Sequence, residues 1–148
     1  MDLEKENKPL ILVTGSAGLI GSRVVESLSA DYMMVGMDVK EPKQRTAKSD
    51  FIECDLTKDE SVSSAFDMAR ERHGDRIASV IHLAAYYDFT GQPSDLYQKL
   101  TVEGTFRLLK ELKEFQTEQF VFSSSLLVME EAEEGEKLTE FSPLEDEP

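Results

Sequence analysis

The sequence has little of three features that would indicate other classes of protein: cysteine, basic charge and long apolar runs. Its single cysteine, Cys54, excludes an internal disulfide framework and is typical of a reducing cytoplasm. No apolar run approaches the ~20 residues that a membrane-spanning helix needs. The polar start MDLEKENKPL is similar neither to a secretory signal nor to an Arg-rich transit peptide. We therefore expect a cytoplasmic protein with no membrane partner.

Acidic residues outnumber basic ones by 30 to 16, which gives a formal net charge of −14. Such a charge disfavours nucleic acids and anionic membranes as partners. Much of it lies in residues 130–148, which we expect to form a solvated acidic tail or loop. The two histidines, His73 and His82, are distant from each other, and with one cysteine they give no metal-ligand spacing. We expect no metal site.

Apolar strands and amphipathic helices alternate along the chain. The pattern predicts strands at 9–15, 31–39, 51–56, 77–85 and 119–128, and helices at 21–30, 57–74 and 94–115. Strands that are apolar on both faces and separated by helices predict an α/β fold with a parallel sheet covered on two sides. We expect a doubly wound (Rossmann) sheet of about five strands with helices on both faces, in one domain over residues 1–129. Cys54 is interpreted as a core residue, as are the apolar positions of the last helix, Leu96, Leu100, Phe106, Leu109 and Leu112.

The stretch LILVTGSAGLIG, residues 10–21, indicates a phosphate-binding loop between a buried strand and a helix. Gly15 permits a tight turn, Gly18 lets the backbone approach a pyrophosphate, and Gly21 lets the helix pack on the sheet. The helix N-terminus, at Leu19 and Ile20, offers unpaired N–H groups and a partial positive charge to phosphates. The loop therefore predicts a bound dinucleotide.

Asp38 ends the second predicted strand, about twenty residues after the loop. A carboxylate there accepts hydrogen bonds from the adenosine ribose hydroxyls and repels a 2′-phosphate. This favours NAD over NADP, although Lys40, Lys43 and Arg45 follow closely and weaken the distinction.

The Gly-x-x-Gly-x-x-Gly spacing of this loop resembles that of the extended short-chain dehydrogenase/reductase family, which includes NAD-dependent sugar-nucleotide epimerases and dehydratases. Four further stretches are similar to the family in the same order, DL at 55–56, HLAA at 82–85, TVEGTFRLL at 101–109 and FVFSSSLLV at 120–128. The resemblance covers nearly the whole chain. It implies a dinucleotide cofactor, a small-molecule substrate that is a nucleotide sugar in many members, and a homodimer as an expected assembly.

The resemblance also implies roles for single positions. Asp55 and Leu56 are expected to contact adenine, and Leu83, Ala84 and Ala85 to pass beside the cofactor. Thr101 stands where the family usually has an asparagine, and the resemblance implies that it lies near the cofactor. Ser123 is expected to line the nicotinamide or to cap the turn.

Ser125 occupies the place of the family's catalytic serine, which hydrogen-bonds the reacting substrate oxygen. The alternative is a serine that caps backbone groups at a strand end. The family's acid/base motif Tyr-x-x-x-Lys occurs nowhere in the sequence, and its expected place lies just after Pro148. Neither Tyr86 nor Tyr87 has a lysine four residues later, so neither is expected to replace it.

Two functions remain open on these residues. One is the NAD-binding part of an epimerase, dehydratase or reductase, incomplete for catalysis as it stands. The other is a regulatory module that senses NAD(P) without turnover. The aromatic stretch 86–89 fits a nicotinamide or substrate contact and the closing of the core equally well, and His82 is interpreted as a structural histidine.

Overall fold

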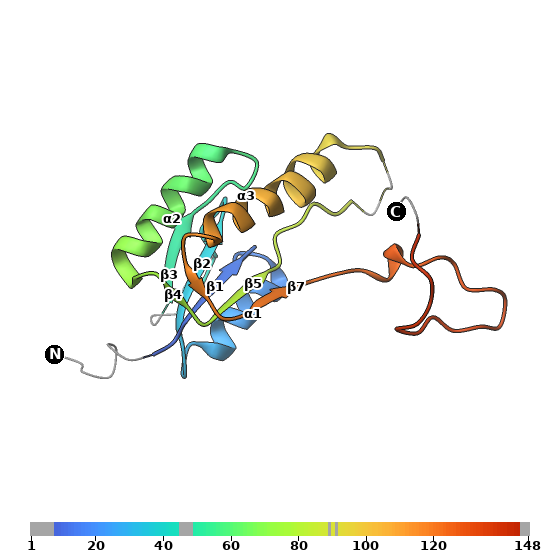
Figure 1. The fold of residues 1–148 in the computed structure, drawn as a ribbon, viewed down its shortest axis with the longest axis horizontal. Helices are drawn as coiled ribbons and strands as arrows, with labels where there is room; N and C mark the ends of the chain where they lie inside the picture. Colours follow the sequence, from blue (N-terminus) through green and yellow to red (C-terminus); the bar gives the residue numbers. More distant parts are fainter. Residues whose placement is uncertain (1–7, 45–48, 89, 91, 146–148) are drawn as a thin grey trace.

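The computed structural model describes residues 8–44, 49–88, 90 and 92–145. Its main sheet has five parallel strands in the order β3 (Ser49–Glu53), β2 (Met33–Asp38), β1 (Leu10–Thr14), β5 (Ser79–His82) and β7 (Phe120–Phe122). A small second sheet pairs β4 (Arg76–Ile77) with β6 (Gln116–Thr117). The predicted doubly wound parallel sheet is confirmed (Figure 1).

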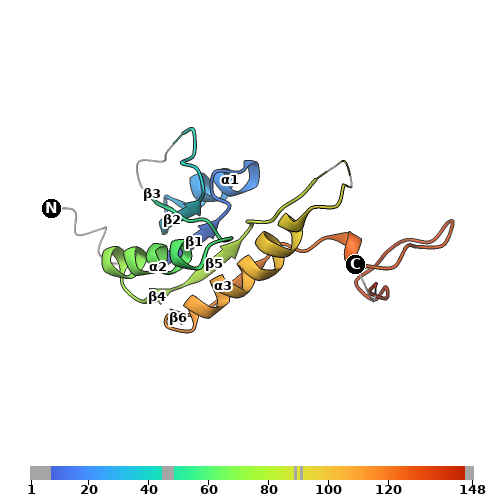
Figure 2. The ribbon, with the colours of Figure 1, turned by 90° about the horizontal axis from the view of Figure 1, so that it is seen from above.

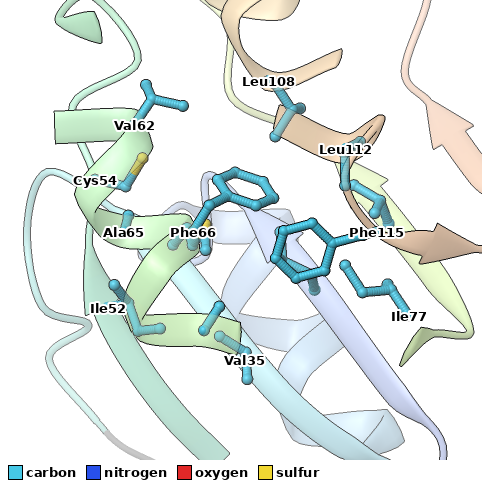
Figure 3. Packing of buried hydrophobic residues seen from close by; sticks show 14 of the residues in the cluster. Val35, Ile52, Cys54, Val62, Ala65, Phe66, Ile77, Leu108, Leu112 and Phe115 are labelled. Carbon is cyan, nitrogen blue, oxygen red and sulfur yellow. The ribbon is translucent and has the colours of Figure 1, made fainter. Parts of the chain in front are cut away.

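Helices cover the two faces of the main sheet. Helices α2 (Asp59–His73) and α3 (Glu103–Leu112) lie on one face, and α1 (Leu19–Leu28) lies on the other (Figures 1 and 2). The larger core is built under α2 and α3, where the rings of Phe66 and Phe115 meet edge to face at 5.4 Å (Figure 3). Cys54 is buried in this core, as predicted. A smaller core packs Val25 of α1 on Ile11, Val13 and Met34.

Several predicted boundaries differ from the structure. β3 begins at Ser49, inside the predicted loop 41–50, and ends at Glu53. The predicted strand 77–85 is divided into β4 and β5 and ends at His82. The predicted strand 119–128 shortens to β7, followed by a short 3₁₀ turn, η2 (Leu126–Val128).

The long predicted helix 94–115 contains a six-residue π-helical segment, η1 (Tyr97–Val102), before α3 begins. Its predicted core stripe was wrong in part, because Phe106 is 69% exposed and Leu96 and Leu109 lie at the surface. The buried positions follow every fourth residue, with Leu100 partly buried and Gly104, Leu108 and Leu112 buried. A Cβ on Gly104 would lie 3.1 Å from Leu56 Cβ, so the missing side chain allows the close approach.

After β7 the chain runs away from the sheet and returns on itself (Figures 1 and 2). An isolated antiparallel bridge joins Met129 to Leu144, and Glu130 N–H donates to Pro143 O at 3.0 Å. Most of residues 129–145 is exposed. Within the described residues, none of the helices is long and apolar enough to cross a membrane.

Candidate functional site

The carboxyl ends of β1, β2 and β5 surround a cavity of about 310 Å³. β1 lies between β2 and β5, which is the point where the strand order reverses and where such sheets bind ligands. The predicted cofactor residues that line this cavity are Gly15, Gly18, Asp38, Leu56, Leu83, Ala84 and Ala85. Its volume lies within the range of small-molecule sites, roughly 300–1,000 Å³.

The three loop glycines differ in how strictly the backbone conformation and the neighbouring atoms exclude a side chain. Gly15 has a φ of 70°, and a Cβ there would lie 2.9 Å from Ala84 N. A Cβ on Gly21 would lie 2.1 Å from Gly15 O, so a side chain would separate α1 from the loop. Gly18 has an ordinary φ of −72°, and among the described residues beyond its chain neighbours a Cβ would meet only Gly15 O, at 3.2 Å. The fold itself therefore requires glycine at 15 and 21 far more than at 18.

Helix α1 begins at the cavity with its N-terminus open. Gly18 is its N-cap, no side-chain cap is made by the described residues, and the first turn carries no acidic residue. The first intrahelical bond is donated by Ser22 N–H to Gly18 O at 2.9 Å. The N–H groups of Leu19, Ile20 and Gly21 precede it, so helix geometry gives them no partner within α1. Leu19 and Ile20 are exposed and do not line the main cavity.

Asp38 ends β2 beside the glycine loop. Its Oδ2 accepts a hydrogen bond from Ala17 N–H at 3.0 Å, and its Oδ1 accepts one from Lys40 N–H at 3.4 Å. A second hollow of about 640 Å³ on the outer side of the loop is lined by Leu19, Arg23, Lys40 and Lys43 together with the acidic Glu26 and Glu41. The basic side chains of Arg23, Lys40 and Lys43 therefore lie near Asp38, the residue that is expected to favour NAD over NADP.

The turn at Asp55 and Leu56 forms another wall. Asp55 Oδ1 accepts from Thr57 N–H at 3.0 Å and from the Thr57 hydroxyl at 2.6 Å, and this hydrogen bonding lowers the pKa of the carboxyl. Leu56 is buried and lines the cavity, whereas Asp55 lies in a separate shallow hollow. Arg107 of α3 donates to Leu56 O at 3.3 Å and pairs with Asp59, which ties this turn to both helices.

Where β5 ends, the chain turns along the cavity wall. The Thr14 hydroxyl oxygen accepts from the N–H groups of Leu83 at 3.2 Å and Ala84 at 3.3 Å. It also lies 2.6 Å from His82 Nδ1, and His82 Nε2 lies 2.9 Å from Thr105 Oγ1. His82 is 1% exposed, and its burial lowers the pKa of the imidazole to about 4.

Thr101 lies in η1 and does not line the cavity. Its Oγ1 accepts from Tyr86 N–H at 3.1 Å, and its carbonyl accepts from the Thr105 hydroxyl at 2.6 Å. Tyr86 packs edge to face on Tyr97 at 4.9 Å, and Tyr97 Oη accepts from Asp88 N–H at 3.2 Å. These aromatics hold the segment after β5 onto η1. Phe89, the last residue of the aromatic stretch, lies outside the described residues.

The serine turn follows β7 in an exposed segment. Ser125 Oγ accepts from Leu127 N–H at 3.2 Å and so caps η2. Ser123 N–H donates to His82 O at 3.5 Å, which extends the β5–β7 pairing by one residue. Neither serine lines the cavity.

Sequence reasoning did not assign the cavity residues Thr14, Met37, Val39, Cys54 and Leu100 to the site. Three of them are adjacent in sequence to predicted site residues, since Thr14 precedes Gly15 and Met37 and Val39 flank Asp38. Burial, with a further contribution from Asp55 and Asp38, raises the pKa of the Cys54 thiol to about 12, so this residue is a neutral wall group. No cluster of metal-ligating side chains occurs in the part of the chain that the structure describes.

Residues 11–148 match the NAD dependent epimerase/dehydratase family. The chain belongs to this family. A curated relative, the UDP-glucose 4-epimerase of Erwinia amylovora, is 36% identical, and the match covers 80% of this chain and 37% of the relative. The resemblance that the motifs predicted is thereby confirmed.

Solved structures agree on the fold. A short-chain dehydrogenase/reductase superfamily protein from Agrobacterium tumefaciens with bound NAD is 30% identical, with a TM-score of 0.63 over 80% of this chain and 33% of that protein. Uronate dehydrogenase from the same organism, in a mutant complexed with NAD, is 20% identical, with a TM-score of 0.74 over 93% of this chain and 48% of that one. This family member therefore spans about a third to a half of the length of these relatives.

Proposed function

We propose that this chain binds NAD in the cavity at the ends of β1, β2 and β5. Gly18 carries the proposal, because its backbone conformation is ordinary and the described protein around it leaves nearly enough room for a side chain. Glycine at this position is explained by a ligand that must lie against the backbone. The uncapped N-terminus of α1, which Gly18 begins, supplies N–H groups and positive potential for a pyrophosphate.

Each part of the cavity fits one part of the dinucleotide. The apolar wall of Met37, Val39 and Leu56 suits adenine, and Asp38 suits the ribose hydroxyls. The loop and α1 suit the pyrophosphate. The turn at 83–85 begins next to Ser123, whose N–H donates to His82 O at 3.5 Å, and we place the nicotinamide at this end of the cavity. The nicotinamide ring supplies hydride transfer when bound.

The Asp38 carboxylate favours NAD over NADP, since a 2′-phosphate beside it would be repelled. Its position beside Ala17, inside the loop, supports the same choice. Arg23, Lys40 and Lys43 lie farther out, in the hollow beyond the loop, and Arg23 is already paired with Glu26 at 2.8 Å.

We further propose that this chain is the cofactor-binding part of a complete cytoplasmic enzyme, an epimerase, dehydratase or dehydrogenase that acts on a sugar or nucleotide sugar. The epimerase relative and the uronate dehydrogenase suggest that substrate class. The exposed aromatic rings of edge strand β7, Phe120 and Phe122, suggest a sheet that continues in the parent. A homodimer through α3 and the end of η1 is proposed on the exposed side chains of Val102, Phe106 and Leu109.

The proposal is tested by calorimetric titration of the chain with NAD and, separately, with ADP-ribose. We expect saturable binding of both ligands, competition between them, and a rise in melting temperature with ligand concentration. A chain that is folded by circular dichroism but gives neither heat nor thermal shift with either ligand would refute the proposed function.

A further inference from the structure

A buried chain of hydrogen bonds joins β1, β5 and α3 through one imidazole ring. The ring of His82 lies between the Thr14 and Thr105 hydroxyls, at 2.6 and 2.9 Å. It stacks near Phe122 and is tilted toward Phe120, each with a centroid distance of 6.0 Å. The ring is therefore shielded from water and held from both nitrogens.

The hydrogen bonds of this network are all satisfied in only one arrangement of donors and acceptors. Thr101 O is a carbonyl and can only accept, so the Thr105 hydroxyl donates its hydrogen there. Thr105 Oγ1 must then accept from His82, which places the ring hydrogen on Nε2. The neutral ring leaves Nδ1 as an acceptor, and it receives the Thr14 hydroxyl hydrogen. The Thr14 oxygen retains its lone pairs for the backbone N–H groups of the next segment.

That segment, 83–86, is one wall of the cavity, and it is held at both ends. At its start Thr14 Oγ1 accepts from Ala84 N–H and shares Leu83 N–H with the Thr14 carbonyl, and at its end Thr101 Oγ1 accepts from Tyr86 N–H. Thr14 and Thr101, which anchor this segment, are also the two ends of the hydrogen-bond network through His82. The wall is also pressed on the glycine loop, where a Cβ on Gly15 would lie only 2.9 Å from Ala84 N.

We propose that His82 is a positioning residue of the dinucleotide site, which fixes segment 83–86 against the glycine loop by orienting Thr14 with Nδ1 and Thr105 with Nε2. The inference rests on the proposed function, because the affected ligand is the dinucleotide. It assigns to His82 a role beyond stability. Losing either ring contact loosens the wall and weakens binding, even though the ring does not touch the ligand.

The test compares four single variants of the full chain in NAD titrations. Thr105→Val removes the acceptor for Nε2–H, and His82→Asn keeps an acceptor near Nδ1 but cannot reach Thr105. Thr105→Ser keeps the hydroxyl. Ser79→Ala is the matched control, because it removes a buried hydroxyl bond, to Gln119 at 3.0 Å, at the opposite end of β5. The free energy of unfolding of each is measured in urea.

We expect the NAD dissociation constant to rise about threefold to tenfold in Thr105→Val and His82→Asn, as for one lost hydrogen bond. It should stay unchanged in Thr105→Ser and Ser79→Ala. The double variant His82→Asn/Thr105→Val should be no weaker than either single one, since both break the same chain. Equal affinities throughout, or losses that track the free energy of unfolding in Ser79→Ala as well, would overturn the inference.

Nitrogen-15 NMR of the imidazole gives a readout independent of binding. We expect the neutral Nε2–H tautomer at pH 7, with altered shifts in Thr105→Val. An Nδ1–H tautomer or a charged ring would overturn the inference while leaving the proposed function intact. Failure of the unmodified chain to bind NAD would refute the proposed function and remove the inference with it.

Discussion

Asp38, the last residue of β2, accepts a hydrogen bond from the backbone N–H of Ala17, in the middle of the loop that follows β1, at 3.0 Å. The acid that is expected to face the ribose therefore also holds the loop expected to face the phosphates. A change at Asp38 affects both, and the two effects can be separated by the choice of substitution.

Asp38→Ala should weaken NAD binding and narrow the difference between NAD and NADP, because it removes ribose hydrogen bonds and the charge that repels a 2′-phosphate. Each such bond to a charged group contributes about 1.5–3 kcal/mol. Asp38→Asn keeps an acceptor for Ala17 N–H and removes only the charge, so it should relieve the discrimination against NADP with less loss of NAD affinity. Calorimetry with both cofactors measures this. Tighter binding of NADP than of NAD by the unmodified chain would contradict the assignment.

Gly18→Val should abolish NAD binding while costing only about 1 kcal/mol of stability, the usual penalty of a poor N-cap. Gly21→Ala should cost more stability and weaken NAD binding less, because its Cβ would lie 2.1 Å from Gly15 O and must displace α1. Crowding of this kind typically costs about 1–3 kcal/mol. Urea unfolding and NAD titration of both variants check the contrast. Normal NAD affinity in Gly18→Val would show that no phosphate lies at this position.

The stability of the chain should fall as the pH is lowered from 6.5 to 4. Burial lowers the pKa of His82 from 6.5 to about 4, so in this window the unfolded chain binds more protons than the folded one. The expected loss is at most about 3 kcal/mol. The lowered pKa values of Asp50 and Asp55 add a loss that begins as the pH approaches their ordinary value of 3.8 and grows on further acidification.

The control for the pH dependence is His82→Asn, which has no group to titrate at this position. Its unfolding free energy, from urea titrations at pH 7, 6, 5 and 4.5, should vary less with pH than that of the unmodified chain. Identical slopes for the two proteins would mean that His82 is not the group responsible.

The 148-residue chain should give no turnover with NAD and a panel of nucleotide sugars. Ser125 can orient a substrate oxygen, but its hydroxyl already accepts from Leu127 N–H, and a serine hydroxyl without a base is a poor proton acceptor. A missing general acid/base typically costs ~10²–10⁴ in rate. Progress curves should be compared with those of a version extended through any downstream Tyr-x-x-x-Lys. Turnover by the short chain that is lost on changing Tyr86 or Tyr87 would place the acid/base here.

Phe106→Glu should reduce self-association, because Phe106 is 69% exposed on α3 and would meet its symmetry mate in the proposed dimer. Sedimentation velocity at several concentrations measures the effect. Ser64→Glu is a matched control, because it adds a negative charge at an exposed position of α2 without removing an apolar contact on α3. An unchanged sedimentation coefficient in Phe106→Glu would exclude this face as the dimer interface.

The sequence predicted the sheet and the glycine loop because both depend on local patterns of apolar and small residues. It misplaced the buried face of α3, since the closest contact with the Leu56 turn is made by Gly104, which adds nothing to a hydrophobic stripe. It also extended the fourth strand past His82, because an apolar segment such as Leu83–Ala85 looks like a strand. In the structure Leu83 N–H is shared between the Thr14 carbonyl and the Thr14 hydroxyl, and Ala84 N–H donates to that hydroxyl, a contact between residues far apart in sequence. The π-helical turn that holds Thr101 likewise had no signal in the sequence.

β7 forms the open edge of the sheet, and the exposed fractions of Phe120, Val121 and Phe122 are 37%, 41% and 53%. An uncharged aromatic edge is a template for pairing between strands of different molecules. The glutamate-rich residues 130–145 follow β7 after the serine turn and η2, and their mutual repulsion opposes such pairing. This repulsion extends about 30 Å at 0.01 M salt but only about 3 Å at 1 M. The colloidal behaviour of the isolated chain is therefore governed by ionic strength, with dilute buffer keeping the molecules apart and concentrated salt allowing their edges to meet.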